Sequence, residues 1–242
     1  MKNILIHVTG SIACFKAGAL ISLLIKKDYQ VQATASAGGL RFIQPALLEG
    51  LTGRPLLTDI FNGGEDPMHH ITLSQNWADL IIAYPASANC ICRLAAGLSD
   101  DLFGAICLAN NYNKPLLLAP AMNTQMFNHP AVQEALKKLE SWGTHILPTE
   151  EGMLACGTVG KGKLLSPEAT MEYIEKLLES DTIDWRDKDA EVVYQRAVKN
   201  LSGGDLILMH PTAHTVEALP KILAEIKRLD LQAVKVSETL GL

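Results

Sequence analysis

Two short segments of the sequence carry side chains that could hold a ligand and act on it. The first, residues 120–127, follows an apolar run and contains Asn123 between two methionines. An amide flanked by flexible methionines suits a flat apolar ligand with one polar anchor. The second, residues 152–157, places the thiol of Cys156 in a glycine-containing loop. Together the two segments predict a cofactor pocket beside a movable thiol.

Three loops rich in small and polar residues follow apolar runs and precede helical patterns: 10–12, 85–90 and 120–123. At the first, Gly10 allows the backbone to approach a ligand closely, and Ser11 adds a donor at a helix N-terminus. Such an N-terminus offers free N–H groups and a positive dipole end to a phosphate. Since strand carboxyl ends form the ligand crevice of open α/β sheets, the loops predict a crevice there. Capped helix starts are the alternative interpretation.

The loop at Gly10 lacks the GxGxxG pattern of dinucleotide sites, so a mononucleotide such as FMN fits it better. Ser36 ends the second apolar run and could reach the same phosphate. Ser87 and Asn89 offer hydrogen bonds to a planar ring that lies against small residues. Serines are also common in turns, and that interpretation stays open for Ser36.

A pair of histidines, His69 and His70, precedes an Ile-Thr-Leu segment and a polar turn. A histidine here could act as a base near neutral pH. An exposed pair on a loop is the alternative. We expect no metal site, because the sequence does not place further His, Asp or Cys ligands beside the pair.

The elements that must position these residues are alternating apolar strands and amphipathic helices. We expect strands at 4–8, 31–35, 80–84, 115–119 and 144–147, and helices at 13–26, within 36–50, and at 90–97, 101–109, 130–142 and 167–178. Short, continuously apolar strands that alternate with helices indicate a parallel sheet covered on both faces. The prediction is a doubly wound, Rossmann/flavodoxin-like three-layer α/β/α domain over residues 1–180.

Composition excludes several classes of protein. The 242 residues are 48% hydrophobic and 19% charged, with a net charge of −5, as in ordinary globular proteins. We find no basic cluster for nucleic acid and no apolar run of the roughly 18–20 residues that span a membrane. The N-terminus is typical of a first buried strand rather than a signal peptide. Five cysteines, an odd number, favour reduced thiols and a cytoplasmic location.

Six motifs occur in one order, at residues 10–16, 70–73, 85–89, 95–102, 120–126 and 154–157. Together they resemble the homo-oligomeric flavin-containing cysteine decarboxylases, and most closely those that act on phosphopantothenoylcysteine in coenzyme A biosynthesis. The resemblance covers about residues 1–178. It implies FMN as the cofactor, a small-molecule substrate, and trimers, or dodecamers built from trimers, with FMN at subunit interfaces.

The resemblance also assigns roles to single residues. It implies His70 as the catalytic histidine and Asn123 as the group that holds the substrate carboxylate. The residues implied to contact FMN are Gly10, Ser11, Ile12, Ser36, Ser87, Ala88, Asn89, Cys90 and Ala121. Those implied to line or close over the substrate are Met126, Leu154, Ala155 and the catalytic Cys156. Two details differ: the spacing from His70 to Asp79 is one residue longer than in the family, and Phe127 stands where Trp or Tyr is common.

The implied reaction is FMN-dependent decarboxylation of 4′-phosphopantothenoylcysteine to 4′-phosphopantetheine. A cysteine amide has no electron sink, so oxidation to a thioaldehyde must precede loss of CO₂, and the resulting enethiol is then reduced. His70 would assist the oxidation, and Cys156 would donate the final proton. Two alternatives stay open: a flavoprotein that decarboxylates a peptide C-terminal cysteine and stops at the enethiol, and a non-catalytic FMN-binding subunit.

Residues 181–242 do not match this family. Segments 181–185, 204–212 and 236–240 resemble the C-terminal end of NodB-type polysaccharide deacetylases, in which the histidine matched by His210 assists catalysis. The metal-binding motifs of such enzymes are absent from the sequence, and the segment is too short for their barrel. We expect a non-catalytic strand–helix–strand fragment, with a helix at 216–229 between apolar strands at 206–209 and 233–236.

Overall fold

The computed structural model describes residues 2–61, 66–111, 113–153, 157, 159–180, 189–198, 201, 207 and 213–232. The chain forms two compact units, Met1–Met171 and Glu172–Leu242. The division expected from the sequence, into a decarboxylase domain 1–180 and an appendage 181–242, stays a prediction. Among the described residues, no helix is long and apolar enough to cross a membrane.

The first unit is built on a five-stranded sheet in the order β2-β1-β3-β4-β5. Its strands are β1 (Asn3–Val8), β2 (Gln30–Ala35), β3 (Leu80–Ala86), β4 (Leu116–Pro120) and β5 (His145–Ile146). Every neighbouring pair is parallel. All residues of β3 and β4 are buried, as expected for strands covered on both faces. The predicted doubly wound, flavodoxin-like parallel sheet is confirmed.

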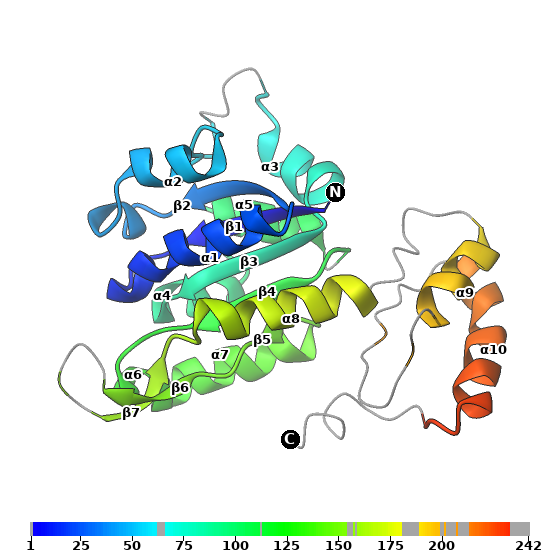
Figure 1. Ribbon diagram of the computed structural model, residues 1–242. Coiled ribbons are helices and arrows are strands. Elements are labelled where there is room, and N and C mark those ends of the chain that lie inside the picture. The colour runs from blue at the N-terminus through cyan, green and yellow to red at the C-terminus, as the bar shows by residue number, and fades with distance from the viewer. Residues whose placement is uncertain are drawn as a thin grey trace. The chain divides into compact units, whose positions relative to one another are not determined.

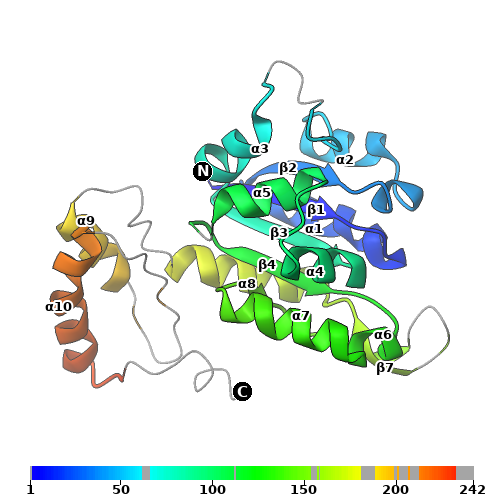
Figure 2. The same ribbon diagram turned by 180° about the vertical axis from the view of Figure 1, so that it is seen from behind.

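Helices cover both faces of this sheet, with α1 in front in Figure 1 and α4, α5 and α7 in front in the reverse view of Figure 2. The helices are α1 (Phe15–Lys26), α2 (Pro45–Thr52), α3 (His69–Ile71), α4 (Ala88–Ala95), α5 (Leu102–Asn110), α6 (Thr124–Asn128), α7 (Pro130–Ser141) and α8 (Pro167–Ser180). Two short 3₁₀ helices, η1 (Ile12–Cys14) and η2 (Gly39–Arg41), and a π-helix, η3 (Thr72–Trp77), complete the described turns.

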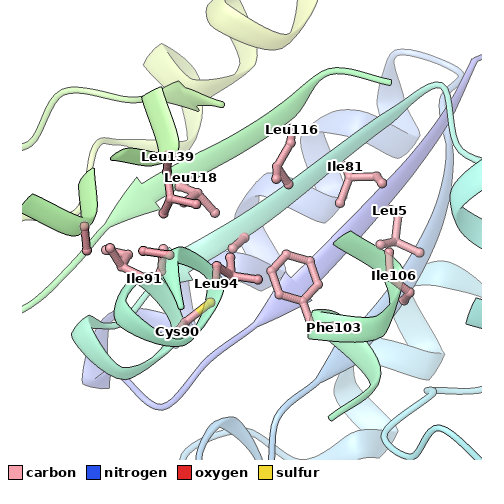
Figure 3. Packing of buried hydrophobic residues seen from close by; sticks show 14 of the residues in the cluster. Leu5, Ile81, Cys90, Ile91, Leu94, Phe103, Ile106, Leu116, Leu118 and Leu139 are labelled. Carbon is pink, nitrogen blue, oxygen red and sulfur yellow. The ribbon is translucent and has the colours of Figure 1, made fainter. Parts of the chain in front are cut away.

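Apolar packing fixes these helices on the sheet. Figure 3 shows side chains of β1, β3 and β4 meeting those of α4, α5 and α7: Leu5, Ile81, Leu116, Leu118, Ile91, Leu94, Phe103, Ile106 and Leu139. Burying one such side chain contributes roughly 1.5–3 kcal/mol. On α1, four of the five apolar positions expected on one side of the helix are fully buried, namely Ala17, Leu20, Ile21 and Leu24, whereas the fifth, Ile25, is 38% exposed. The helix N-termini are therefore held at the carboxyl edge of the sheet.

A two-stranded antiparallel hairpin, β6 (Glu150–Met153) and β7 (Val159–Lys163), follows the sheet. It was not expected, since its residues are mostly polar or glycine and lack an apolar alternation. The Met122 N–H donates to the Gly162 carbonyl at 3.0 Å, and Thr124 Oγ1 donates to the Lys161 carbonyl at 2.8 Å. These bonds tie the hairpin to the loop that carries Asn123.

The second unit contains α9 (Ala190–Val198) and α10 (Ala213–Arg228). Val193 and Ala197 pack against Ala218 and Ile222 in a small apolar cluster. The predicted helix at 216–229 is confirmed as α10, which begins three residues earlier, whereas α9 was not expected. The strands expected at 206–209 and 233–236, and His210, lie outside the described residues except for Ile207.

Candidate functional site

Hydrogen bonds between strand ends bring the three predicted loops together at the carboxyl edge of the sheet. Thr9 Oγ1, at the end of β1, donates to the Pro85 carbonyl at 2.7 Å and accepts from the Ser87 N–H at 2.9 Å. The Ala121 N–H, after β4, donates to the Ala86 carbonyl at 3.0 Å. Loops far apart in the sequence thus become neighbours, as the crevice prediction required.

Each of the three loops also caps a helix. Ser11 Oγ accepts from the Ala13 N–H at 3.4 Å, and Ser87 Oγ accepts from the Cys90 N–H at 3.3 Å. Asn123 Oδ1 accepts from the Gln125 N–H at 2.8 Å and starts α6. The capping interpretation is therefore correct, but it does not compete with ligand binding. A serine that accepts a cap bond through its oxygen keeps its O–H to donate.

A cavity of about 490 Å³ opens where these loops meet. This is within the usual range for small-molecule sites, roughly 300–1,000 Å³. The predicted residues that line it are Gly10, Ser11, Ile12, Ser87, Ala88, Asn89, Ala121, Asn123 and Met126. The first cavity thus collects the residues expected to hold both cofactor and substrate.

A second cavity, of about 500 Å³, shares Gly10, Ser87 and Asn89 with the first and adds Ser36 and Cys90. The two cavities are therefore contiguous along the sheet edge. A Cβ on Gly10 would lie 3.1 Å from the Gly38 carbonyl carbon, so a side chain would force apart the loops after β1 and β2. Ser36 Oγ accepts from the Gly39 N–H at 3.1 Å and so shapes the second loop.

The residues around the two cavities fit FMN. The first cavity is lined largely by apolar side chains, Ile12, Phe15, Met122, Met126 and Met153, which suit a flat ring. The serines at 11, 36 and 87 supply hydroxyl donors beside the N-terminus of the segment 12–26, which suits a ribityl phosphate chain. An apolar compartment continuous with a polar one matches the two ends of a mononucleotide flavin.

His69 and His70 lie on a helix, α3, and not on the expected loop. The alternative interpretation, an exposed pair, does not hold for His69, which is buried with its ring near the carbonyl oxygens of Asp66 (3.2 Å) and Asp59 (3.0 Å). His70 is half-buried, and its Nδ1 has no hydrogen-bond partner among the described residues. His70 is not among the described residues that line either cavity.

The segment between His70 and Asp79, which is one residue longer than the resemblance implies, contains the π-helix η3. The Ala78 N–H donates to the carbonyl of Leu73, five residues earlier, at 2.9 Å. A π-turn holds one residue more than the corresponding α-turn, so an insertion can be absorbed without breaking the helix. At its far end, Asp79 Oδ2 accepts from the Asn3 N–H at 2.8 Å.

Three of the four described thiols, Cys14, Cys90 and Cys107, are unsuited to catalysis. Burial raises the pKa of Cys90 to about 12, and it raises the pKa values of Cys14 and Cys107 as well. A thiol held protonated and buried is a poor nucleophile or redox group. Cys90 therefore lines the second cavity as a small apolar side chain. The three residues implied to close over the substrate, Leu154, Ala155 and Cys156, lie outside the described residues.

Several lining residues were not predicted. In the first cavity they are Ala13, Phe15, Lys16, Met122, Met153, Gly162, Lys163 and Leu164, half of them from the unexpected hairpin and the residue after it. In the second cavity they include His7, which stacks on Phe103 at 4.1 Å, and Arg93, which pairs with Asp100 and Asp101. Lys16 could have been found from the sequence, as a basic residue six positions after Gly10. No sequence pattern pointed to the lining residues of the hairpin.

Comparison with known proteins gives matches over the first three quarters of the chain. A family model described as Flavoprotein matches residues 1–179. The coenzyme A biosynthesis bifunctional protein CoaBC of Bacillus subtilis is 37% identical over 181 residues, 75% of this chain and 44% of that protein. The probable phosphopantothenoylcysteine decarboxylase of Streptococcus mutans is 35% identical over 179 residues, 73% of this chain and 99% of that protein. The chain thus spans less than half the length of the bifunctional relative.

Solved structures match the same part of the chain. A cysteine-to-serine mutant of PPC decarboxylase, complexed with pantothenoylaminoethenethiol, is 32% identical with a TM-score of 0.65 over 72% of this chain and 96% of that one. The FMN binding protein AtHal3 is 33% identical with a TM-score of 0.63 over 72% of this chain and 95% of that one.

Proposed function

Because this chain belongs to the flavoprotein family, we propose that it binds FMN and decarboxylates 4′-phosphopantothenoylcysteine to 4′-phosphopantetheine, a step of coenzyme A biosynthesis. The observation that carries the proposal is the cavity at the carboxyl edge of the sheet. Most of the predicted cofactor residues and two of the predicted substrate residues, Asn123 and Met126, line it, in a chain that is 35% identical to a probable phosphopantothenoylcysteine decarboxylase.

FMN, when bound, would supply the two-electron oxidation of the substrate carbon that bears sulfur, and the resulting thiocarbonyl would accept the electron pair that CO₂ leaves behind. The chain itself binds and orients the cofactor. Hydrogen bonds to the cofactor come from the hydroxyl groups of Ser11, Ser36 and Ser87. Gly10, which has no side chain, lets the cofactor approach the backbone closely. Ala88, Ala121 and Cys90 contribute small surfaces against which it lies.

Asn123 positions the substrate carboxylate. Because its side-chain oxygen caps α6, the amide nitrogen is the group that donates to the carboxylate. The cap fixes the side chain before substrate arrives, so the bond to be broken is aligned without further ordering. Met126, on the same short helix, lines the cavity beside it.

His70 reaches the reaction from another subunit. In a single chain it is not among the described residues lining either cavity, yet Ile12 and Phe15 at the first cavity are 60% and 70% exposed. Large apolar side chains exposed at a cavity mouth are typical of interaction surfaces. We therefore propose a homo-oligomer, either a trimer or a dodecamer built from trimers, with FMN at the subunit interfaces.

Cys156 donates the proton that completes the saturated thiol, on a segment with Leu154 and Ala155 that closes over the substrate. Support comes from the described cysteines: burial raises the pKa values of Cys14, Cys90 and Cys107, and Cys92 lines neither cavity. The described cysteines Cys14, Cys90, Cys92 and Cys107 are all free thiols, which supports a cytoplasmic location.

The test is anaerobic incubation of the FMN-loaded protein with 4′-phosphopantothenoylcysteine, with CO₂ release and product mass followed. We expect CO₂ and a saturated aminothiol, and accumulation of the enethiol by Cys156→Ser. An enethiol product from the unmodified protein would instead indicate a peptide-type decarboxylase. Bound flavin without CO₂ release would overturn the proposal in favour of a binding role.

The segment 181–242 is proposed to take no part in this chemistry. Its resemblance to a NodB-type deacetylase does not extend to a metal site, and the described residues of the chain contain no group of three His, Cys, Asp or Glu side chains placed to bind a metal. Removal of residues 181–242 should leave decarboxylation by the remaining domain measurable in the same assay.

A further inference from the structure

We propose that Lys163 binds the 4′-phosphate of the substrate and thereby selects phosphorylated over unphosphorylated pantothenoylcysteine. The inference rests on the proposed function and deepens it, because it assigns the group that recognises the substrate's second anionic end. It concerns the hairpin side of the first cavity, which the sequence did not predict.

The first cavity has two basic side chains in its lining. Its charged lining residues are Lys16 and Lys163, and no acidic side chain is among the described residues that line it. Lys16 Nζ donates to the Leu164 carbonyl at 3.1 Å and so stands beside the end of β7. Glu150 contacts Lys163 and offsets one of these charges, but the two ammonium groups together still offer several N–H donors to an anion such as a phosphate monoester.

Lys163 is held in place from outside the cavity. Its Nζ lies 2.8 Å from Glu150 Oε2, and Glu150 Oε1 accepts from the Ser166 N–H at 2.9 Å. The hydrogen bond from Lys163 lowers the pKa of Glu150, so this carboxylate stays ionised. An ammonium group has three N–H donors, so one bond to Glu150 orients Lys163 without exhausting its capacity.

The backbone of β7 places this lysine at the cavity. The neighbouring Gly162 has φ +107° and lies so close to the Met122 carbonyl that a Cβ would overlap it. The hairpin is thus pressed against the loop before Asn123, and Lys163 and Asn123 line the same space. A neutral amide suits the carboxylate end of the substrate, and the lysines suit its phosphate end.

The experiment compares kcat/KM for phosphorylated and unphosphorylated pantothenoylcysteine in FMN-loaded full-length protein. We expect Lys163→Gln to lower kcat/KM for the phosphorylated substrate by about 10- to 100-fold and to leave the unphosphorylated one nearly unchanged. Lys163→Arg should retain the preference. The matched control is Lys161→Gln, a lysine on the same strand whose side chain is 61% exposed and does not line the cavity.

A binding measurement without turnover shows whether Lys163 binds the phosphate of the substrate or the phosphate of FMN. Affinities for 4′-phosphopantothenate and pantothenate are measured by calorimetry, and flavin content is measured by absorbance. Loss of phosphate discrimination in Lys163→Gln, with flavin content retained, supports the inference. Loss of flavin from Lys163→Gln would assign the lysine to the cofactor phosphate. An equal loss of affinity for 4′-phosphopantothenate and pantothenate would assign it a structural role. Either result overturns the inference. Failure of the unmodified protein to release CO₂ would instead defeat the proposed function, while the binding comparison would still test Lys163.

Discussion

At the scale of single residues, Asn123 combines a structural and a chemical role that one substitution can separate. Asn123→Asp keeps an oxygen that caps α6 but replaces the amide donor with a negative charge. We expect kcat/KM to fall at least about 100-fold, because the new carboxylate repels the substrate's, while the melting temperature hardly changes.

The control for that prediction is Asn123→Ala, which removes both the donor and the cap. Loss of an N-cap costs about 1 kcal/mol, so this variant should lose stability as well as activity. Unchanged activity in Asn123→Asp would show that the side chain does not meet the substrate carboxylate. Steady-state kinetics and thermal unfolding of the two variants, measured side by side, decide the point.

A second residue-scale prediction concerns His7, which is buried beside Phe103 with Nδ1 2.9 Å from Thr34 Oγ1. Burial lowers its pKa from 6.5 to about 3, so the folded protein holds it neutral. In the unfolded chain His7 binds a proton below about pH 6.5, whereas in the folded protein it does not until about pH 3. Acid therefore favours the unfolded chain, and the free energy of unfolding falls as the pH is lowered from about 6.5 towards 3. The slope is at most about 1.4 kcal/mol per pH unit.

Urea unfolding across this pH range measures the effect. His7→Gln removes the titrating group while retaining a polar side chain, so its free energy of unfolding should fall less steeply with acid than that of the unmodified protein. Burial lowers the pKa of His145 in the same direction, but His145 is present in both proteins and cancels in the difference. Parallel curves for the two proteins would contradict the prediction.

At the scale of elements, the docking of the β6–β7 hairpin depends on Gly162. An alanine there would need the strained positive φ and would overlap the Met122 carbonyl. We expect Gly162→Ala to release the hairpin, to lower kcat/KM, and to increase hydrogen exchange in residues 150–163. The backbone strain alone costs roughly 1–2 kcal/mol.

Gly143 provides the matched control for this prediction. It also has a positive φ, +99°, but a Cβ there would meet nothing within 4 Å. Gly143→Ala should therefore show the cost of strain without hairpin release or loss of activity. If both variants behave alike, the contact with Met122 does not hold the hairpin in place.

Elements with strong apolar patterns could be predicted from the sequence, and elements without them could not. The continuously apolar β3 and β4 and the one-sided α1 are signalled by residues that the core buries, so periodicity finds them. The hairpin is held to the loop around Met122 by hydrogen bonds to its backbone carbonyls, and the π-helix η3 is a short segment after His70. Neither leaves a periodic pattern in the side chains.

At the scale of the whole molecule, half of the candidate site follows from topology. In a parallel sheet with the order β2-β1-β3-β4-β5, loops after β1, β3 and β4 must share an edge. Gly10, Ser87 and Asn123 could therefore be placed together before any coordinates were known. Lys163 could not, because its place depends on how a polar hairpin docks, and His70 is not among the described residues that line either cavity.

The proposed oligomer can be tested by a substitution at its expected interface. Phe15 lines the first cavity and is largely exposed, so in an oligomer with FMN at its interfaces it would be covered by a second subunit. Phe15→Glu would then bury a charge that has no partner, which costs far more than an interface of moderate size can offset. We expect this variant to be monomeric and to lose most of its flavin while it remains folded.

Light scattering after size-exclusion chromatography gives the mass, and the ratio of flavin to protein absorbance gives the cofactor content. Leu108→Glu is the control, since Leu108 is a similarly exposed apolar residue on α5 that lines neither large cavity. An unmodified protein that is monomeric yet fully loaded with FMN would show that one chain completes the cofactor site. His70 would then have to act from within its own subunit or not at all, so the mass measurement also decides whether that histidine keeps its assigned role.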